Sequence, residues 1–151
     1  MSSATDALSV TTNDVGGYTV TIQMAGASNN LVSGSNNLLP SAGTTAAPAA
    51  LVVGSGTAAP TGAWGFCVPS ASGNGGYTTT FVTCDTTNNS VAMTSGLYAP
   101  VPLAGAPFTL FNTSSSSVST YTTTVTFGVA VNNGQASGTY TGTVVFTAIA
   151  T

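Results

Sequence analysis

The sequence predicts an all-β protein, an antiparallel β-sandwich of about eight strands. Apolar and β-branched residues recur at every second position in several segments, which is the period of a half-buried strand. Clusters of Gly, Asn and Ser lie between these segments and predict turns. No stretch has a helical pattern, and the prolines at 40, 48 and 60 oppose a long helix in the first half of the chain.

The C-terminal third has the clearest strand pattern. Residues 121–131, YTTTVTFGVAV, place aromatic and aliphatic side chains on one face and threonines on the other. After an Asn-Asn-Gly turn, residues 139–149 place Tyr140, Val144 and Phe146 on one face. Two strands joined by such a turn predict a hairpin. An isolated hairpin is only marginally stable, so we expect it to pack on further strands.

The N-terminal end repeats this pattern, because residues 7–12 and 18–24 flank a turn cluster at 13–17 and predict a second hairpin. Residues 25–60 are rich in Ala, Gly, Ser and Asn and predict a long connection with short strands, one of them around 49–53. The remaining strands are expected at 62–68, 77–84, 90–94 and 108–111, with 62–68 and 77–84 forming a wide hairpin and 113–120 forming a loop.

These strands predict a sandwich that is immunoglobulin-like in general form. We expect one β-sandwich domain at 13–151, preceded by an N-terminal segment at 1–12 that is able to act as a donor strand. No second domain is indicated in a chain of 151 residues.

The chain almost lacks charge. It has no Lys, Arg or His, and charged residues are 2% of the total, compared with about 25% in ordinary soluble domains. Because no cation is available to neutralise phosphate, the composition argues against nucleic-acid partners. A hydrophobic content of 42% also argues against disorder. Such a surface suits a protein that packs against copies of itself or carries sugar.

Catalytic and metal-binding groups are missing from their usual patterns. Without His or Lys, no Ser or Thr hydroxyl has a base to activate it. The three carboxylates, Asp6, Asp14 and Asp85, are scattered in the sequence. Asp14 is expected to cap its own turn rather than to bind calcium together with Asn13. We therefore expect no enzymatic activity, no metal site and no cofactor.

Cys67 and Cys84 are expected to form a disulfide, which would close a loop of roughly 17 residues and stabilise the fold by about 3 kcal/mol. The alternative is two separate buried thiols. A disulfide indicates an oxidising compartment, and hence an extracellular location at the cell surface. No apolar stretch is long enough for a membrane-spanning helix. The N-terminus lacks a signal-peptide pattern, so we expect the mature form.

Sugar is the other expected surface feature. Asn88 and Asn112 each begin an N-x-[ST] sequon, and the serines at 114–117 would suit O-linked sugar. The alternative at each position is a bare polar loop. Trp64, with Phe66, is expected in the core rather than as a platform that stacks on sugar.

The N-terminal segment is the expected assembly element, with Ala4, Ala7, Leu8 and Val10 as its donor-strand residues. Natural monomers protect sheet edges with Lys, other charges or proline. This chain has no lysine for that role, so its Thr-rich strands are poorly protected unless they are paired. Strand addition to the edge of a neighbour builds open, head-to-tail filaments.

The segment 138–144, GTYTGTV, resembles the "A-G-T-Y-x-D-T-V" closing strand of spore-coat-U-like and archaic chaperone–usher pilins, with Gly142 where those families usually have Asp. Residues 126–128, TFG, are similar to their "V-Y-G" strand, and residues 11–20 resemble their second strand and the preceding turn. The usual cysteine near the N-terminus is absent. Archaeal pili and threads built by donor-strand exchange are similar in low charge and β-rich composition. The resemblance implies a pilin-like fold and a fibre subunit whose terminal strand completes a neighbour.

The sequence thus predicts a structural subunit of an extracellular pilus or fimbria-like filament, whose partners are copies of itself. One alternative is a surface adhesin or lectin-like module, in which residues 25–60 or the loops near Trp64 contact host or cell-surface glycans. Another is an S-layer or capsid tile, which differs mainly in assembly geometry.

Overall fold

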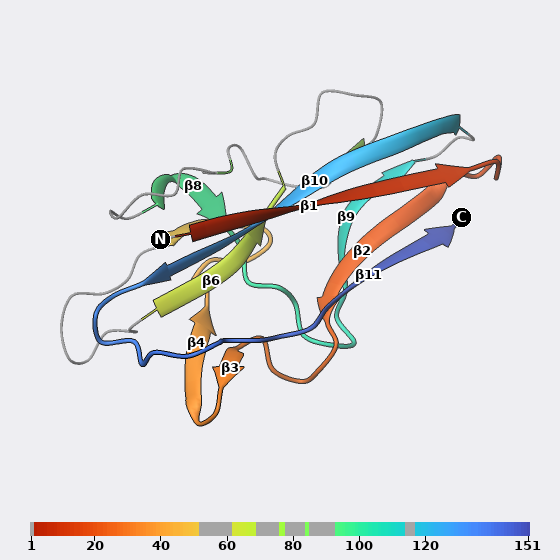
Figure 1. The fold of residues 1–151 in the computed structure, drawn as a ribbon. Helices are drawn as coiled ribbons and strands as arrows, with labels where there is room; N and C mark the ends of the chain where they lie inside the picture. The colour runs from red at the N-terminus through yellow and green to blue at the C-terminus, as the bar shows by residue number, and fades with distance from the viewer. Residues whose placement is uncertain (1, 52–61, 69–75, 78–83, 85–92, 114–116) are drawn as a thin grey trace.

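The computed structural model describes residues 2–51, 62–68, 76–77, 84, 93–113 and 117–151. These residues form eleven β-strands and no helix, which confirms the all-β class (Figure 1). In chain order the strands are β1 (Ser2–Thr12), β2 (Tyr18–Met24), β3 (Leu31–Ser33), β4 (Asn36–Pro40), β5 (Ala49–Leu51), β6 (Gly62–Cys67), β7 (Gly76–Tyr77), β8 (Met93–Tyr98), β9 (Phe108–Thr113), β10 (Ser117–Val131) and β11 (Val144–Ala150).

The strands are arranged in three sheets. The first has the order β1-β10-β6-β4-β3, the second has the order β11-β2-β9-β7, and the third consists of β5 and β8. All pairs are antiparallel except β4 and β6, which run parallel with Leu39 opposite Ala63. The expectation of purely antiparallel pairing is therefore wrong in the five-stranded sheet. A parallel pair needs a long connection, and the segment 41–61 between β4 and β6 supplies that length.

Both predicted terminal hairpins are wrong. β10 pairs with β1 and β6, whereas β11 pairs with β2 in the other sheet. In the same way, the turn at 13–17 carries the chain from β1 in one sheet to β2 in the other. Alternation shows which face of a strand is buried, but it does not show which strand is the neighbour. The expected hairpin of 62–68 with 77–84 lies mostly outside the described residues, and the short described piece, β7, pairs with β9 in the four-stranded sheet.

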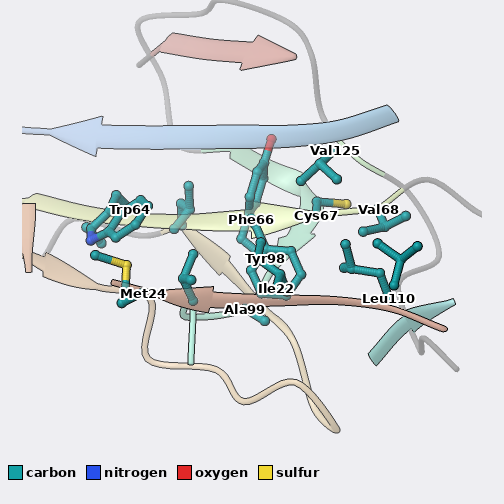
Figure 2. Packing of buried hydrophobic residues seen from close by; sticks show 14 of the residues in the cluster. Ile22, Met24, Trp64, Phe66, Cys67, Val68, Tyr98, Ala99, Leu110 and Val125 are labelled. Atoms are coloured by element: carbon teal, nitrogen blue, oxygen red, sulfur yellow. The ribbon is translucent and has the colours of Figure 1, made fainter. Parts of the chain in front are cut away.

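The hydrophobic core takes side chains from both larger sheets (Figure 2). β2 has the predicted bounds and alternates strictly, with Tyr18, Val20, Ile22 and Met24 buried. Among the described residues, aromatic rings from the two larger sheets meet in two places. Phe66 of β6 lies 6.1 Å from Phe108 of β9, and Phe127 of β10 lies 6.5 Å from Phe146 of β11, measured between ring centroids.

Trp64 is a core residue, as the sequence predicts. Its side chain is 3% exposed, and its indole Nε1 donates a hydrogen bond to the carbonyl oxygen of Asn29 at 2.7 Å. In Figure 2 its ring lies beside Met24, a residue of the four-stranded sheet. This burial argues against Trp64 as a surface platform for sugar.

The middle of the chain contains more strand than expected. The two similar pieces at 29–34 and 36–41 form the antiparallel pair β3–β4, with Gly34 at a φ of 59° in the turn between them. β5 falls within the strand expected around 49–53. β8 extends to Tyr98, beyond the strand expected at 90–94, and β10 begins at Ser117, within the loop expected at 113–120. Most of the strands expected at 77–84 and 90–94 lie outside the described residues.

Candidate assembly interface

β1 is the edge strand of the five-stranded sheet. It pairs with β10 along nearly its whole length, from Ser2 opposite Val129 to Val10 opposite Tyr121. Among the described residues no other strand pairs with β1. In Figure 1 β1 and β10 run in opposite directions and cross in this view, with β1 in front. The element that was predicted to act as a donor strand is thus paired within its own chain.

The predicted donor residues lie on both faces of β1. Leu8 and Val10 are half-buried and pack against the core. Because side chains alternate along a strand, Ala4 shares their face, whereas Ala7 lies on the opposite, outer face. Ala4 and Ala7 are both exposed. Only the C-terminal half of β1 therefore inserts large apolar side chains.

The outer face of the β1–β10 pair carries a ladder of hydroxyl groups. Ser9 Oγ lies 3.2 Å from Thr122 Oγ1, and Thr11 Oγ1 lies 2.7 Å from Thr120 Oγ1. β10 continues this pattern with further threonines at 124 and 126. The pairing is therefore held by backbone and hydroxyl hydrogen bonds, without ion pairs.

Two hollows lie between β1 and β11, the edge strand of the four-stranded sheet. The larger has a volume of about 460 Å³ and is lined by Asp6 of β1 and by Val144 and Phe146 of β11. The smaller, of about 190 Å³, lies between residues 10–12 of β1 and 148–150 of β11. Along both strands the residues that line the larger hollow come before those that line the smaller one, so the two hollows follow one another in the same direction. Together the hollows define an edge groove that follows β1 from Asp6 to Thr12.

The larger hollow has apolar walls. Besides β11, its described lining includes Trp64 of β6 and Phe127 and Val129 of β10. Asp6 is the only charged residue among the described residues that line it. Phe127 of the five-stranded sheet and Phe146 of the four-stranded sheet are both only half-buried here. When β1 pairs with the β10 of its own chain, it thus leaves apolar surface uncovered beneath its N-terminal half.

The turn between β1 and β2 is tightly held. Asp14 Oδ1 accepts a hydrogen bond from the Gly16 N–H at 2.9 Å, so Asp14 caps its own turn as the sequence predicts. Gly17 has a φ of 86°, and a Cβ there would lie 2.3 Å from the carbonyl oxygen of Thr113. Thr151 adds two hydrogen bonds to this turn. Its backbone N–H donates to the carbonyl oxygen of Gly17, and its Oγ1 donates to the carbonyl oxygen of Gly16.

The other predicted site residues are separate from this groove. Cys67 and Cys84 are joined by a disulfide with Cα atoms 5.6 Å apart, the pairing that the sequence predicts. Asn112 is exposed on β9. Asn88, Asp85 and residues 114–116 lie outside the described residues. Among the described residues, no group of three or more His, Cys, Asp or Glu side chains is placed to hold a metal ion. None of them forms a helix that could span a membrane.

The groove residues Phe127, Val144 and Phe146 were predicted to be inward-facing, but their shared site was not. The site could not be predicted from the expected hairpin of 121–131 with 139–149, because that pairing would have put these two strands side by side in one sheet. The half-buried state of two aromatic rings on consecutive strands is the signal that marks the site.

Comparisons of the chain with protein-family models, with curated proteins and with solved structures found no match. What the interface does is therefore inferred from its own geometry.

Proposed function

We propose that the protein is the structural subunit of an extracellular filament, in which β1 of one subunit pairs with β10 of the next. On this proposal the two facing sheets are an immunoglobulin-like, pilin-like sandwich, and the chain's partners are copies of itself. The observation that carries the proposal is that β1 is a long edge strand with β10 as its one partner strand among the described residues.

Exchange of β1 has a small energetic cost in principle. Every hydrogen bond that β1 makes with β10 in its own chain is available on the β10 of a neighbour, so exchange loses few contacts. A swapped element is a low-cost route to association, and a head-to-tail contact that does not close builds an open filament. When β1 leaves, it uncovers β10, whose edge carries no lysine or other charge to block an incoming strand.

Other features support the same reading. The disulfide between Cys67 and Cys84 suits an oxidising, extracellular location. The near absence of charge suits a surface that is covered by other subunits. A glycan-binding module is less well supported, because Trp64 is buried in the core.

Disulfide trapping between two variants tests the exchange directly. Ser9→Cys and Thr122→Cys place new thiols at positions whose hydroxyl oxygens are 3.2 Å apart, in a chain whose own two cysteines are bonded to each other. Each variant carries only one new thiol, so a Ser9–Thr122 disulfide in a mixture of the two must join two chains. Thr124→Cys, the next position on the same face of β10, is mixed with Ser9→Cys in a parallel experiment, and we expect covalent dimers after mild oxidation in at least one of the two mixed assemblies.

The matched control replaces Ser9→Cys by Asn37→Cys, another exposed strand position, on β4. This variant mixed with Thr122→Cys is expected to give no dimer above the level of random collisions. Filaments that form without any Ser9–β10 cross-link would show that assembly uses a different contact. Protein that remains monomeric under all conditions would refute the filament proposal itself.

A further inference from the structure

The fit between β1 and the edge groove is uneven within one subunit. Leu8 and Val10 pack against the core, and only the smaller hollow, about 190 Å³, remains beside Val10, whereas the larger hollow, about 460 Å³, lies under Asp6. Its walls include Phe127 and Phe146, so the hollow suits a large apolar side chain. A carboxylate gains nothing from such walls, because a charge is stabilised by water or by a polar partner.

We infer that β1 docks on a neighbouring subunit two residues further along β10 than it does within its own chain. This inference rests on the proposed filament and concerns the register of the exchanged strand. In the shifted register Leu8 lies opposite Val125 rather than Thr123, at the position that Asp6 has in the isolated subunit. Leu8 then enters the larger hollow, and Val10 takes the former place of Leu8.

The size and direction of the shift follow from the strand pattern. A shift of one residue would turn Leu8 and Val10 to the outer face, so the smallest shift that keeps them inward is two. The opposite direction would bring Ala4 over the hollow, which fills it less well than Leu8. β10 also has room in the required direction, because Ser2 lies opposite Val129 and the strand continues to Val131.

The hydroxyl ladder on the outer face does not oppose the shift. Threonines stand at every second position of β10 from 120 to 126. After the shift Ser9 meets Thr124 instead of Thr122, and Thr11 meets Thr122 instead of Thr120. Ser9 and Thr11 therefore each keep a hydroxyl partner, and these two contacts leave the register weakly specified.

The turn at 13–17 explains why the shift is confined to the assembly. A shift of two residues moves β1 by about 7 Å along β10. Within one subunit the turn resists this movement, because Asp14 caps it and Gly17 packs against Thr113. In an exchanged pair the same residues run between two subunits, so they no longer set the position of β1 on the β10 that it contacts.

The register is measured by comparing two cysteine partners for Ser9→Cys. In mixed filaments we expect Ser9→Cys to cross-link Thr124→Cys roughly tenfold more than Thr122→Cys, since a two-residue offset takes the Cα atoms beyond disulfide range. In isolated monomers the order is reversed: the double variant Ser9→Cys/Thr122→Cys closes within one chain, and Ser9→Cys/Thr124→Cys does not.

The outcomes separate this inference from the proposed function. Cross-linking between subunits that favours Thr122→Cys would leave strand exchange intact and overturn the shift. Filaments with no cross-link to either position would overturn both.

A second variant, Asp6→Leu, gives an independent test, because it fills the larger hollow in the unshifted register. We expect it to stabilise the monomer and slow assembly, with Asp6→Asn as the control that removes the charge without filling the hollow. Faster assembly of Asp6→Leu would count against the shift.

Discussion

The rings of Phe127 and Phe146 lie 6.5 Å apart with their planes at 64°, although the two residues belong to different sheets. Phe127 is on β10, which pairs with β1 and β6, and Phe146 is on β11, which pairs with β2. The turn and connection at 132–143 therefore carry the chain from the five-stranded sheet to the four-stranded sheet. This contact joins the two sheets next to the edge groove.

Phe127→Ala should destabilise the subunit by removing this contact. Complete burial of Phe makes truncation to Ala cost about 3–5 kcal/mol, so a half-buried ring should cost about 2 kcal/mol. Urea denaturation of the monomer would measure the change. Leu103→Ala, at a residue that is 42% exposed, is the control and should cost little. Equal losses in both variants would show that the contact between sheets contributes nothing specific.

Gly128 should not tolerate a side chain. A Cβ at this position would lie 2.5 Å from the Tyr98 ring and 2.8 Å from Leu51, because the β5–β8 pair covers the outer face of the five-stranded sheet there. We expect Gly128→Ala to cost about 1–3 kcal/mol through overpacking. Gly26→Ala is the matched control, since no atom lies within 4 Å of its Cβ position. Thermal unfolding of both variants measures the difference, and a neutral Gly128→Ala would contradict this packing.

Thr123→Val should stabilise the protein. Thr123 is 3% exposed, and its Oγ1 finds no hydrogen-bond partner among the described residues. A buried hydroxyl without a partner costs about 1–3 kcal/mol, and Val keeps the shape of the side chain. We expect a gain of about 1 kcal/mol by chemical denaturation. A loss of stability would mean that the hydroxyl has a partner that this account omits.

Removal of the disulfide should lower stability by about 3 kcal/mol, as expected for a loop of this length. The variant Cys67→Ala/Cys84→Ala removes the bond, which has a sequence separation of 17. Denaturation of the unaltered protein under reducing conditions provides the comparison and should show a similar loss. If reductant has no effect on the unaltered protein, the bond does not contribute to its stability.

Assembly should respond weakly to salt. The chain has no Lys, Arg or His, so the contact between β1 and β10 includes no pair of oppositely charged side chains. Raising NaCl from about 0.15 M to 1 M shortens the Debye length from about 8 to 3 Å, which would weaken an interface held by ion pairs. We expect little change in the extent of assembly measured by light scattering. Disassembly at high salt would point to an electrostatic contact that is absent from this interface.

Local features of this chain are predictable from its sequence, whereas its strand pairing is not. The bounds of β2, the cap at Asp14 and the core position of Trp64 each follow from residues close in sequence or from a single side chain's character. The two terminal hairpins failed because the choice of a neighbouring strand depends on the whole core. The turn at Asn132–Gly134 fits a hairpin locally, yet Thr141 exchanges backbone hydrogen bonds with Val32, far away in the sequence.

The edge groove could not be predicted for the same reason. The described walls of its larger hollow come from five strands of two sheets, and the approach of these strands depends on the crossings at 13–17 and 132–143. A strand near the N-terminus was nevertheless predicted from residues alone, because its alternation is visible in the sequence. Its role as a donor strand stays a prediction. Whether that strand pairs with its own β10 or with a neighbour's is a property of the assembly.

The most direct test is a cryo-electron-microscopy map of the native assembly at a resolution that traces the backbone. Exchange predicts a filament in which the strand beside each β10 continues through residues 13–17 into the β2 of an adjacent subunit. A map in which that strand continues into the β2 of the same subunit would contradict the account.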